Sequence, residues 1–295
     1  MQLLFKTIGF IIGLNLLVSV CSGETIFNYN LNRLDVHNNL PDCLNEVSGL
    51  TNIDSSHVAC VQDEHGTVFI YNFIKGKIIS QHSFNDTGDF EGIAYTGDSI
   101  YILRSDGRLT EWSNFKSGLI NVKHYKLRLF TANNEGLCHD KKYNRLLIAA
   151  KSKPLDHDEK YERYIYSFDL FQKHLFEKPL YSINIKRLAK KAQEFNIPAY
   201  STTKKGEKKP LNFRPSGLAI HPLSDNIYII SATDRLLIVI NRKGEVIHMK
   251  QLDSELFTKA EGITFLRDGT MVIANEAAGK VPTLLVYKMQ KTNIN

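Results

Sequence analysis

The sequence predicts an all-β protein that forms a single β-propeller of five blades. A short apolar strand begins five times with Ser-Gly or Glu-Gly before an aliphatic residue, and a second apolar strand follows each copy. The motif glycines lie 43, 44, 81 and 45 residues apart, and a repeat of about 40–50 residues is typical of a propeller blade. These glycines are Gly49, Gly92, Gly136, Gly217 and Gly262.

Turn residues divide each repeat into three or four strands. In the first repeat, Asp54-Ser55-Ser56, His65-Gly66 and Lys75-Gly76 separate apolar segments with alternating polarity. Asp106-Gly107 in the second repeat and Lys243-Gly244 in the fourth occupy similar places. Short alternating strands joined by such pairs are typical of antiparallel hairpins. The repeats therefore predict antiparallel blades.

The fifth repeat ends soon after its third strand at residues 283–289, which leaves its blade without an outer strand. Residues 25–40 precede the first repeat and include the apolar positions of a further strand. Closing the ring removes the exposed edges that invite aggregation. We therefore expect an N-terminal strand to complete the last blade, within a propeller domain at residues 25–290.

The interval from Gly136 to Gly217 is nearly two periods long. It holds either a sixth, degenerate blade or one blade with an insertion. Residues 186–195 resemble a short basic helix that ends before Pro198, and residues 201–210 are polar. These features favour five blades with an insertion at residues 186–210, and six blades are the alternative.

Residues 1–21 have the features of a signal peptide or lipoprotein signal. Lys6 precedes an apolar run from Thr7 to Val20, too short to span a bilayer comfortably and of the length of a signal-peptide core. Cys21 is then a candidate for lipidation; cleavage near Ser22 and a retained anchor are the alternatives. All three place the propeller outside the cytoplasm. We expect a cell-envelope protein that associates with the membrane through its N-terminus, by lipidation or a retained anchor, and faces the periplasm or the exterior.

The repeat motifs also resemble a known family. The sequences DFEGI at 89–93, NEGL at 134–137, PSGL at 215–218 and AEGI at 260–263 are similar to repeats of the SdiA-regulated β-propeller family, as is the insertion after the third repeat. The resemblance runs from about Leu40 to Met289. It implies an extracytoplasmic or membrane-attached propeller, distantly similar to calcium-dependent phytase propellers, with a link to calcium.

Rotational symmetry predicts an acidic site at one end of the channel. The residues before the motif glycines form one ring, and the ends of the second strands form another that meets it, because antiparallel neighbours place one strand's start beside the other's end. Crowded carboxylates raise one another's pKa or bind a cation, and Ca²⁺ accepts six to eight oxygen ligands. The candidate calcium ligands are Glu91, Glu135, Glu261, Glu276 and Asp63.

A purely structural role for these carboxylates is the alternative, in which they pair with Arg104, Lys151 or Arg235, or accept hydrogen bonds from backbone amides. Arg104 and Lys151 are also the candidates for gripping an anionic ligand. The sequence contains neither a G-x-S-x-G elbow nor an HExxH motif, so no catalytic residue can be assigned.

These observations favour a monomeric binding or scaffold module over an enzyme. The alternative is a metal-dependent phosphoesterase, by analogy with phytases. A third hypothesis is a protein partner bound by the insertion at residues 186–210. The net charge is +6, but Lys and Arg are scattered and no nucleic-acid module is recognised, so we expect a protein or a small anionic ligand as partner rather than nucleic acid.

Overall fold

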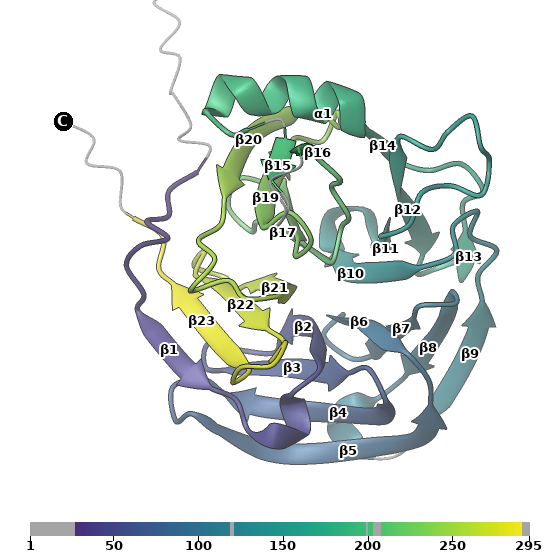
Figure 1. The fold of residues 1–295 in the computed structure, drawn as a ribbon. Helices are drawn as coiled ribbons and strands as arrows, with labels where there is room; N and C mark the ends of the chain where they lie inside the picture. Colours follow the sequence, from purple (N-terminus) through teal and green to yellow (C-terminus); the bar gives the residue numbers. More distant parts are fainter. Residues whose placement is uncertain (1–26, 119–120, 199, 203–207, 291–295) are drawn as a thin grey trace, which may run out of the picture.

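The computed structural model describes residues 27–118, 121–198, 200–202 and 208–290. They form a propeller of five antiparallel blades around a central channel (Figure 1). The prediction of five blades is confirmed, and the six-blade alternative is wrong because the long interval holds one blade and an insertion. The N-terminal signal predictions, including lipidation of Cys21, concern residues outside those described.

The strands of each blade run outward from the channel in chain order, except in the last blade. Blade 1 consists of β2 (Val47–Asn52), β3 (His57–Gln62), β4 (His65–Asn72) and β5 (Lys77–Thr87). Blade 2 consists of β6 (Phe90–Tyr95), β7 (Ile100–Arg104), β8 (Arg108–Trp112) and β9 (Val122–Lys126). Blade 3 consists of β10 (Asn134–Asp140), β11 (Arg145–Ala150) and β12 (Glu162–Asp169), with β13 (His174–Leu175) and β14 (Tyr181–Asn184) both paired to β12.

Blade 4 consists of β17 (Gly217–Ile220), β18 (Ile227–Ser231), β19 (Leu236–Ile240) and β20 (Val246–Gln251). Blade 5 consists of β21 (Ala260–Phe265), β22 (Met271–Asn275), β23 (Thr283–Tyr287) and β1 (Val36–Asn39). Short 3-10 turns lie between strands at η1 (Asp42–Leu44), η2 (Phe115–Ser117) and η3 (Lys141–Tyr143).

The N-terminal strand closes the ring, as predicted. β1 pairs antiparallel with β23, from Val36 opposite Val286 to Asn39 opposite Thr283. The backbone amides of Asp35 and Leu40 extend the contact by donating to the carbonyls of Val286 and Pro282. The first and last parts of the described chain therefore hold each other in blade 5.

The predicted insertion is also present. It contains α1 (Ile185–Ala192), the 3-10 turn η4 (Gln193–Phe195) and a hairpin of β15 (Tyr200–Thr202) and β16 (Lys208–Pro210). Asn184 caps α1 by accepting the Arg187 amide, because the first amides of a helix have no partner within it. None of the helices among the described residues is long and apolar enough to cross a membrane.

Apolar side chains fill the spaces between blades. The buried hydrophobic residues form five clusters, each made by two adjacent blades, and α1 joins the cluster between blades 3 and 4. A repeat of this kind cannot bury its apolar faces alone and depends on its neighbours. The complete ring is therefore the folding unit.

The motif glycines allow the inner strands to approach one another. A Cβ at Gly92 would lie 2.6 Å from the Leu137 Cβ and 2.7 Å from the Glu135 carbonyl oxygen, both in blade 3. The equivalent glycines meet the next blade in the same way, and Gly262 of blade 5 meets Leu50 of blade 1. The Gly requirement in the sequence motif thus comes from close packing of the inner strands.

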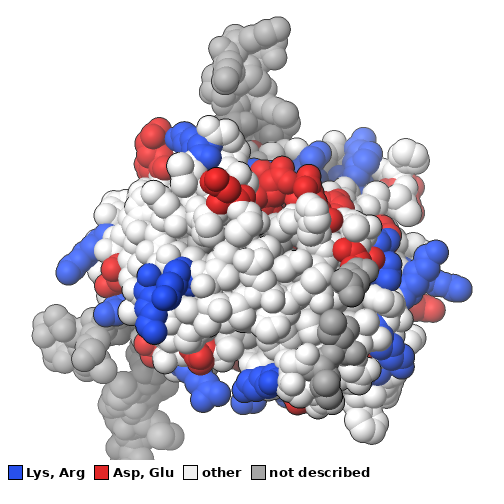
Figure 2. All heavy atoms as spheres, turned by 90° about the horizontal axis from the view of Figure 1, so that it is seen from below, with Lys and Arg blue, Asp and Glu red and all other residues white. Residues whose placement is uncertain are grey.

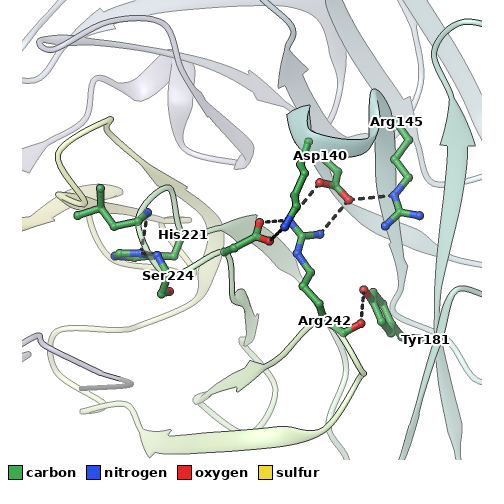
Figure 3. A network of polar contacts seen from close by, with 9 residues as sticks. Asp140, Arg145, Tyr181, His221, Ser224 and Arg242 are labelled. Carbon is green, nitrogen blue, oxygen red and sulfur yellow. Dashed lines mark hydrogen bonds and ion pairs between the residues drawn. The ribbon is translucent and has the colours of Figure 1, made fainter. Parts of the chain in front are cut away.

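An ionic network joins blades 3 and 4 at the end of β10 (Figure 3). The carboxylate of Asp140 is fully buried and accepts hydrogen bonds from Arg145 Nε at 2.9 Å and from Arg242 Nη1 at 2.8 Å. Arg242 also pairs with Asp225, which in turn pairs with Lys142 at 2.8 Å. This network lies at the opposite end of the inner strand from Glu135, so we assign it to the joining of blades.

Candidate functional site

Irregular strand pairing directs three glutamates into the channel. The registers of β6, β10 and β21 with their neighbours shift by one residue immediately before the motif glycine. Such a bulge leaves one residue out of the ladder and changes the direction of its side chain. The bulged residues are Glu91, Glu135 and Glu261, and all three line a small pocket in the channel.

The first residues of the inner strands meet the ends of the second strands at one end of the channel. We call this end the channel mouth. The registers confirm that the two rings of residues meet there: Asn134 lies opposite Ala150, and Ala260 lies opposite Asn275. Rotational symmetry therefore correctly predicted that the starts of the inner strands and the ends of the second strands lie together.

Serines occupy the two remaining positions of the inner ring and are bonded to the backbone. Ser48 Oγ donates to the Phe90 carbonyl at 2.5 Å, and Ser216 Oγ donates to the Ala260 carbonyl at 2.7 Å. Each bond runs to the next blade, so the serines help to close the ring. The glutamates are therefore the ionisable side chains of the inner ring.

Glu135 is fully buried and pairs with the ammonium of Lys151. Its Oε1 also accepts a hydrogen bond from Asn133 Nδ2 at 3.2 Å, whereas Oε2 has no hydrogen-bond partner among the described residues. Burial, together with the negative charge of Glu261, raises the pKa of Glu135 to about 8. Lys151 opposes this rise but does not cancel it.

Glu261 is buried with 4% of its surface exposed, and neither carboxylate oxygen has a hydrogen-bond partner in the described part of the chain. Lys259 Nζ lies 3.6 Å from Oε1, at ion-pair distance, but its closer partner is Glu276. Burial is the main cause of a raised pKa for Glu261. Burying an ionised carboxylate without hydrogen bonds or a close counter-charge costs free energy.

Glu91 completes the inner ring and has no ion-pair partner within the described residues. Burial raises its pKa to about 9, and the charges of Glu135 and Asp89 add to the effect. Protonation is one way to relieve such repulsion, and binding a cation is another.

Further carboxyl groups surround the inner ring. Asp63, Asp89, Glu46 and Glu276 interact electrostatically with one another or with the inner glutamates. Burial, together with the neighbouring carboxyl groups, raises the pKa of Asp63 to about 7. The described residues thus bring seven carboxyl groups and two lysines, Lys151 and Lys259, into one cluster. Figure 2, which views the propeller from the side of blade 1, shows a compact group of Asp and Glu side chains at the rim of one face.

Most of the residues singled out from the sequence meet at the channel mouth. Glu91, Glu135, Glu261, Glu276, Asp63 and Lys151 all belong to the cluster. Arg104 does not: its guanidinium pairs with Asp106 at 2.5 Å and donates to the Thr87 carbonyl. Lys259, Asp89 and Glu46 also belong to the cluster but were not predicted from the sequence, although Lys259 and Asp89 each lie two residues before a motif glutamate.

The donor atoms at the channel mouth suit a hard cation, but they do not form a ready coordination shell. All are carboxylate or amide oxygens, and several are buried without a partner, including both oxygens of Glu261 and Oδ1 of Asn275. Within the described residues, no three Asp, Glu, His or Cys side chains lie close enough together to hold a metal ion. A small metal ion would therefore require the carboxylates to move toward it.

Solved propellers resemble this fold at low sequence identity. Glutaminyl cyclase of Myxococcus xanthus matches with a TM-score of 0.54 and 13% identity, over 88% of this chain and 97% of that one. A nidogen/laminin complex matches with a TM-score of 0.48 and 13% identity, over 78% and 72% of the two chains. Streptogramin B lyase matches with a TM-score of 0.48 and 13% identity, over 85% and 96%.

The match to glutaminyl cyclase supports the propeller fold alone. No curated protein matches the sequence. A model of the SdiA-regulated family does match, over residues 26–175, which is about half of the 295 residues. That region spans the closing strand, the first two blades and much of the third, including Glu91 and Glu135. The chain belongs to the SdiA-regulated family.

Proposed function

We propose that this propeller is a binding module of the cell envelope that takes up a cationic ligand at the channel mouth. One observation carries the proposal: among the described residues, Glu261 is buried with neither oxygen hydrogen-bonded, inside a cluster of seven carboxyl groups and two lysines. A positive charge placed among these groups would stabilise their ionised forms. The site is thus suited to bind a cation rather than an anion.

Calcium is the first candidate ligand. Its flexible shell of oxygen ligands tolerates carboxylates that arrive from several blades. The inner glutamates would hold it together with amide oxygens such as Asn275 Oδ1, once the side chains had moved closer than they lie here. An organic ammonium is the second candidate, because it offers the same charge without requiring a close coordination shell.

Attachment to the envelope is the other part of the proposal. It rests on the apolar run before Cys21 and on the position of Phe27, the first described residue, at the surface of the propeller. Lipidation of Cys21, cleavage near Ser22 and a retained anchor all deliver the propeller to the outer side of the membrane.

A phosphoesterase remains the alternative function, but the geometry supports it less well. Lys151 and Lys259 are paired with glutamates, and Arg104 is paired with Asp106. A phosphate ester would therefore meet an excess of negative charge unless bound metal ions reversed it. Metal ions would therefore have to bind before a phosphate ester could. Hydrolysis of phosphate esters in the presence of CaCl₂ is the activity that would support this function.

Thermal unfolding with added cations tests the proposal. A ligand that binds only the folded protein raises the midpoint. We expect CaCl₂ or spermidine to raise the midpoint of the wild type at pH 8, and Glu261→Gln to remove most of that rise. Glu194→Gln, outside the channel mouth, is the matched control and should respond like the wild type. No rise with either cation, or an equal rise in Glu261→Gln, would overturn a cation site here.

A further inference from the structure

The helix α1 presents a basic face to solvent. Ile185, Leu188 and Ala192 are buried against the propeller, whereas Lys186, Arg187 and Lys190 are exposed. These three residues form no ion pair within the described chain, although Lys186 Nζ lies 4.0 Å above the centre of the Tyr161 ring. Lys191, in the last turn of α1, pairs with Glu194 at 2.6 Å. We call Lys186, Arg187 and Lys190 the basic face.

The N-terminal part of the chain joins the propeller beside this helix. The ring of Phe27 stacks on His248 of β20 with 4.5 Å between ring centres, and His248 contacts Phe195, in the turn that follows α1, at 5.4 Å. Figure 1 shows the beginning of the described chain near β20 and α1. One histidine side chain thus separates Phe27 from the end of the insertion's helical segment.

Tyr29 holds the N-terminal segment on the propeller. It is buried, and its hydroxyl donates to the Gly269 carbonyl at 2.5 Å and lies 2.8 Å from His221 Nε2. His221 Nδ1 accepts the backbone amides of Leu223 and Ser224, so Nε2 carries the proton that is donated to Tyr29. The segment that leads to the N-terminus therefore leaves the propeller from a fixed place.

The length of the remaining chain limits the distance to the membrane. Phe27 lies six positions after Cys21, and a fully extended segment of six residues spans about 20 Å. An anchor at Cys21 would hold Phe27 within about this distance of the lipid surface, and the end of the helical segment that contains α1 lies beside Phe27. Electrostatic attraction acts over about 8 Å at physiological ionic strength, so a modest tilt brings the basic face into range.

We propose that the basic face of α1 docks onto anionic lipid headgroups and orients the anchored propeller. The inference rests on the proposed envelope attachment, and it adds a second contact to the N-terminal one. Juxtamembrane Lys and Arg clusters are attracted to anionic leaflets, and a weak anchor gains from such a second contact. The channel mouth would then be held in one orientation relative to the membrane.

The test uses the full chain with vesicles of phosphatidylcholine alone or of phosphatidylcholine mixed with phosphatidylglycerol. Flotation reports attachment, and the rate of lysine acetylation, read by mass spectrometry, reports whether Lys186 and Lys190 face lipid. We expect flotation with both vesicles, and labelling of these lysines that is several-fold slower with the anionic vesicles. High salt should restore the rate, because it screens the attraction.

Lys77 and Lys126, exposed on blades 1 and 2, are internal controls and should be labelled equally with both vesicles. Arg187→Gln should reduce the protection of Lys186 and Lys190, whereas Lys126→Gln should not. Flotation with equal labelling of Lys186 and Lys190 in both vesicles would overturn the docking proposal and leave attachment standing. Failure to float with either vesicle would overturn attachment, and the docking proposal with it.

Discussion

The fully buried carboxylate of Glu135 is paired with the ammonium of Lys151, which directly follows the neighbouring strand of the same blade. This pair offsets part of the negative charge at the channel mouth. In the described part of the chain Glu91 has no such partner, and Lys259 is shared between Glu261 and Glu276. The lysines therefore neutralise part of the cluster and leave the rest available to a ligand.

Removing Lys151 should expose the cost of the buried charge. Removing one partner of a buried ion pair typically destabilises a protein by about 3 kcal/mol or more. We expect Lys151→Met to lower the free energy of unfolding at pH 8, measured by urea denaturation. The double variant Lys151→Met/Glu135→Gln should recover much of the loss, because it removes the uncompensated carboxylate. A double variant no more stable than Lys151→Met would show that the charge is not the cause.

The inner glutamates should make the ligand-free protein less stable as the pH rises. The pKa of Glu91 in the folded state is about 9, against an ordinary value of 4.5, so between these values the folded state holds more protons than the unfolded state. The stabilisation is fully present below pH 4.5 and is lost as the pH rises through 9. Glu91→Gln should flatten this decline in the thermal midpoint and raise the midpoint at pH 9.

Glu194→Gln is the control for that experiment, since Glu194 lies in the exposed turn after α1. Its midpoint should follow the wild type across the whole pH range. If Glu91→Gln declines as steeply as the wild type between pH 5 and 9, Glu91 is not protonated in the folded state and the assignment fails.

The motif glycines should differ in their tolerance of alanine. At Gly92 a new Cβ would meet the Leu137 Cβ and the Glu135 carbonyl, neither of which can move without the backbone of blade 3. At Gly136 the closest atom is the end of the flexible Leu218 side chain, also at 2.6 Å. We expect Gly92→Ala to lower stability by about 1–3 kcal/mol, and Gly136→Ala to cost less. The reverse order in chemical denaturation would contradict the proposed close packing.

The Asp140 network should contribute more to stability than a surface ion pair. Arg242→Met removes two hydrogen bonds from a buried carboxylate and leaves it with Arg145 alone. We expect a loss of about 1–3 kcal/mol. Lys191→Met, which breaks the exposed pair with Glu194, should cost less than about 1 kcal/mol. Equal losses for the two variants would mean that the network does not join blades 3 and 4.

Much of the fold could be predicted because the repeat reflects a packing requirement. The inner strands approach so closely that each needs glycine at the same position, and Gly92 and Gly262 therefore stand out in the sequence. The inner glutamates could be located for the same reason, since Glu91, Glu135 and Glu261 precede these glycines and rotation brings them to one mouth.

The partners of the glutamates could not be predicted from the repeat, because side-chain direction depends on local geometry. Arg104 and Asp106 are two residues apart across a tight turn and pair with each other, so Arg104 does not reach the ring. Lys259 lies before the motif rather than at a strand end, and the bulge before Gly262 decides which carboxylates it meets. Repeat periodicity carries no information on either contact.

Isothermal titration of CaCl₂ and of spermidine into the wild type and into Glu135→Gln/Glu261→Gln at pH 8 is the most direct test of the channel mouth as a cation site. We expect a saturable binding event for at least one of the two cations in the wild type and its loss in the double variant. Binding that is equal in both proteins, or absent from the wild type for both cations, would contradict it.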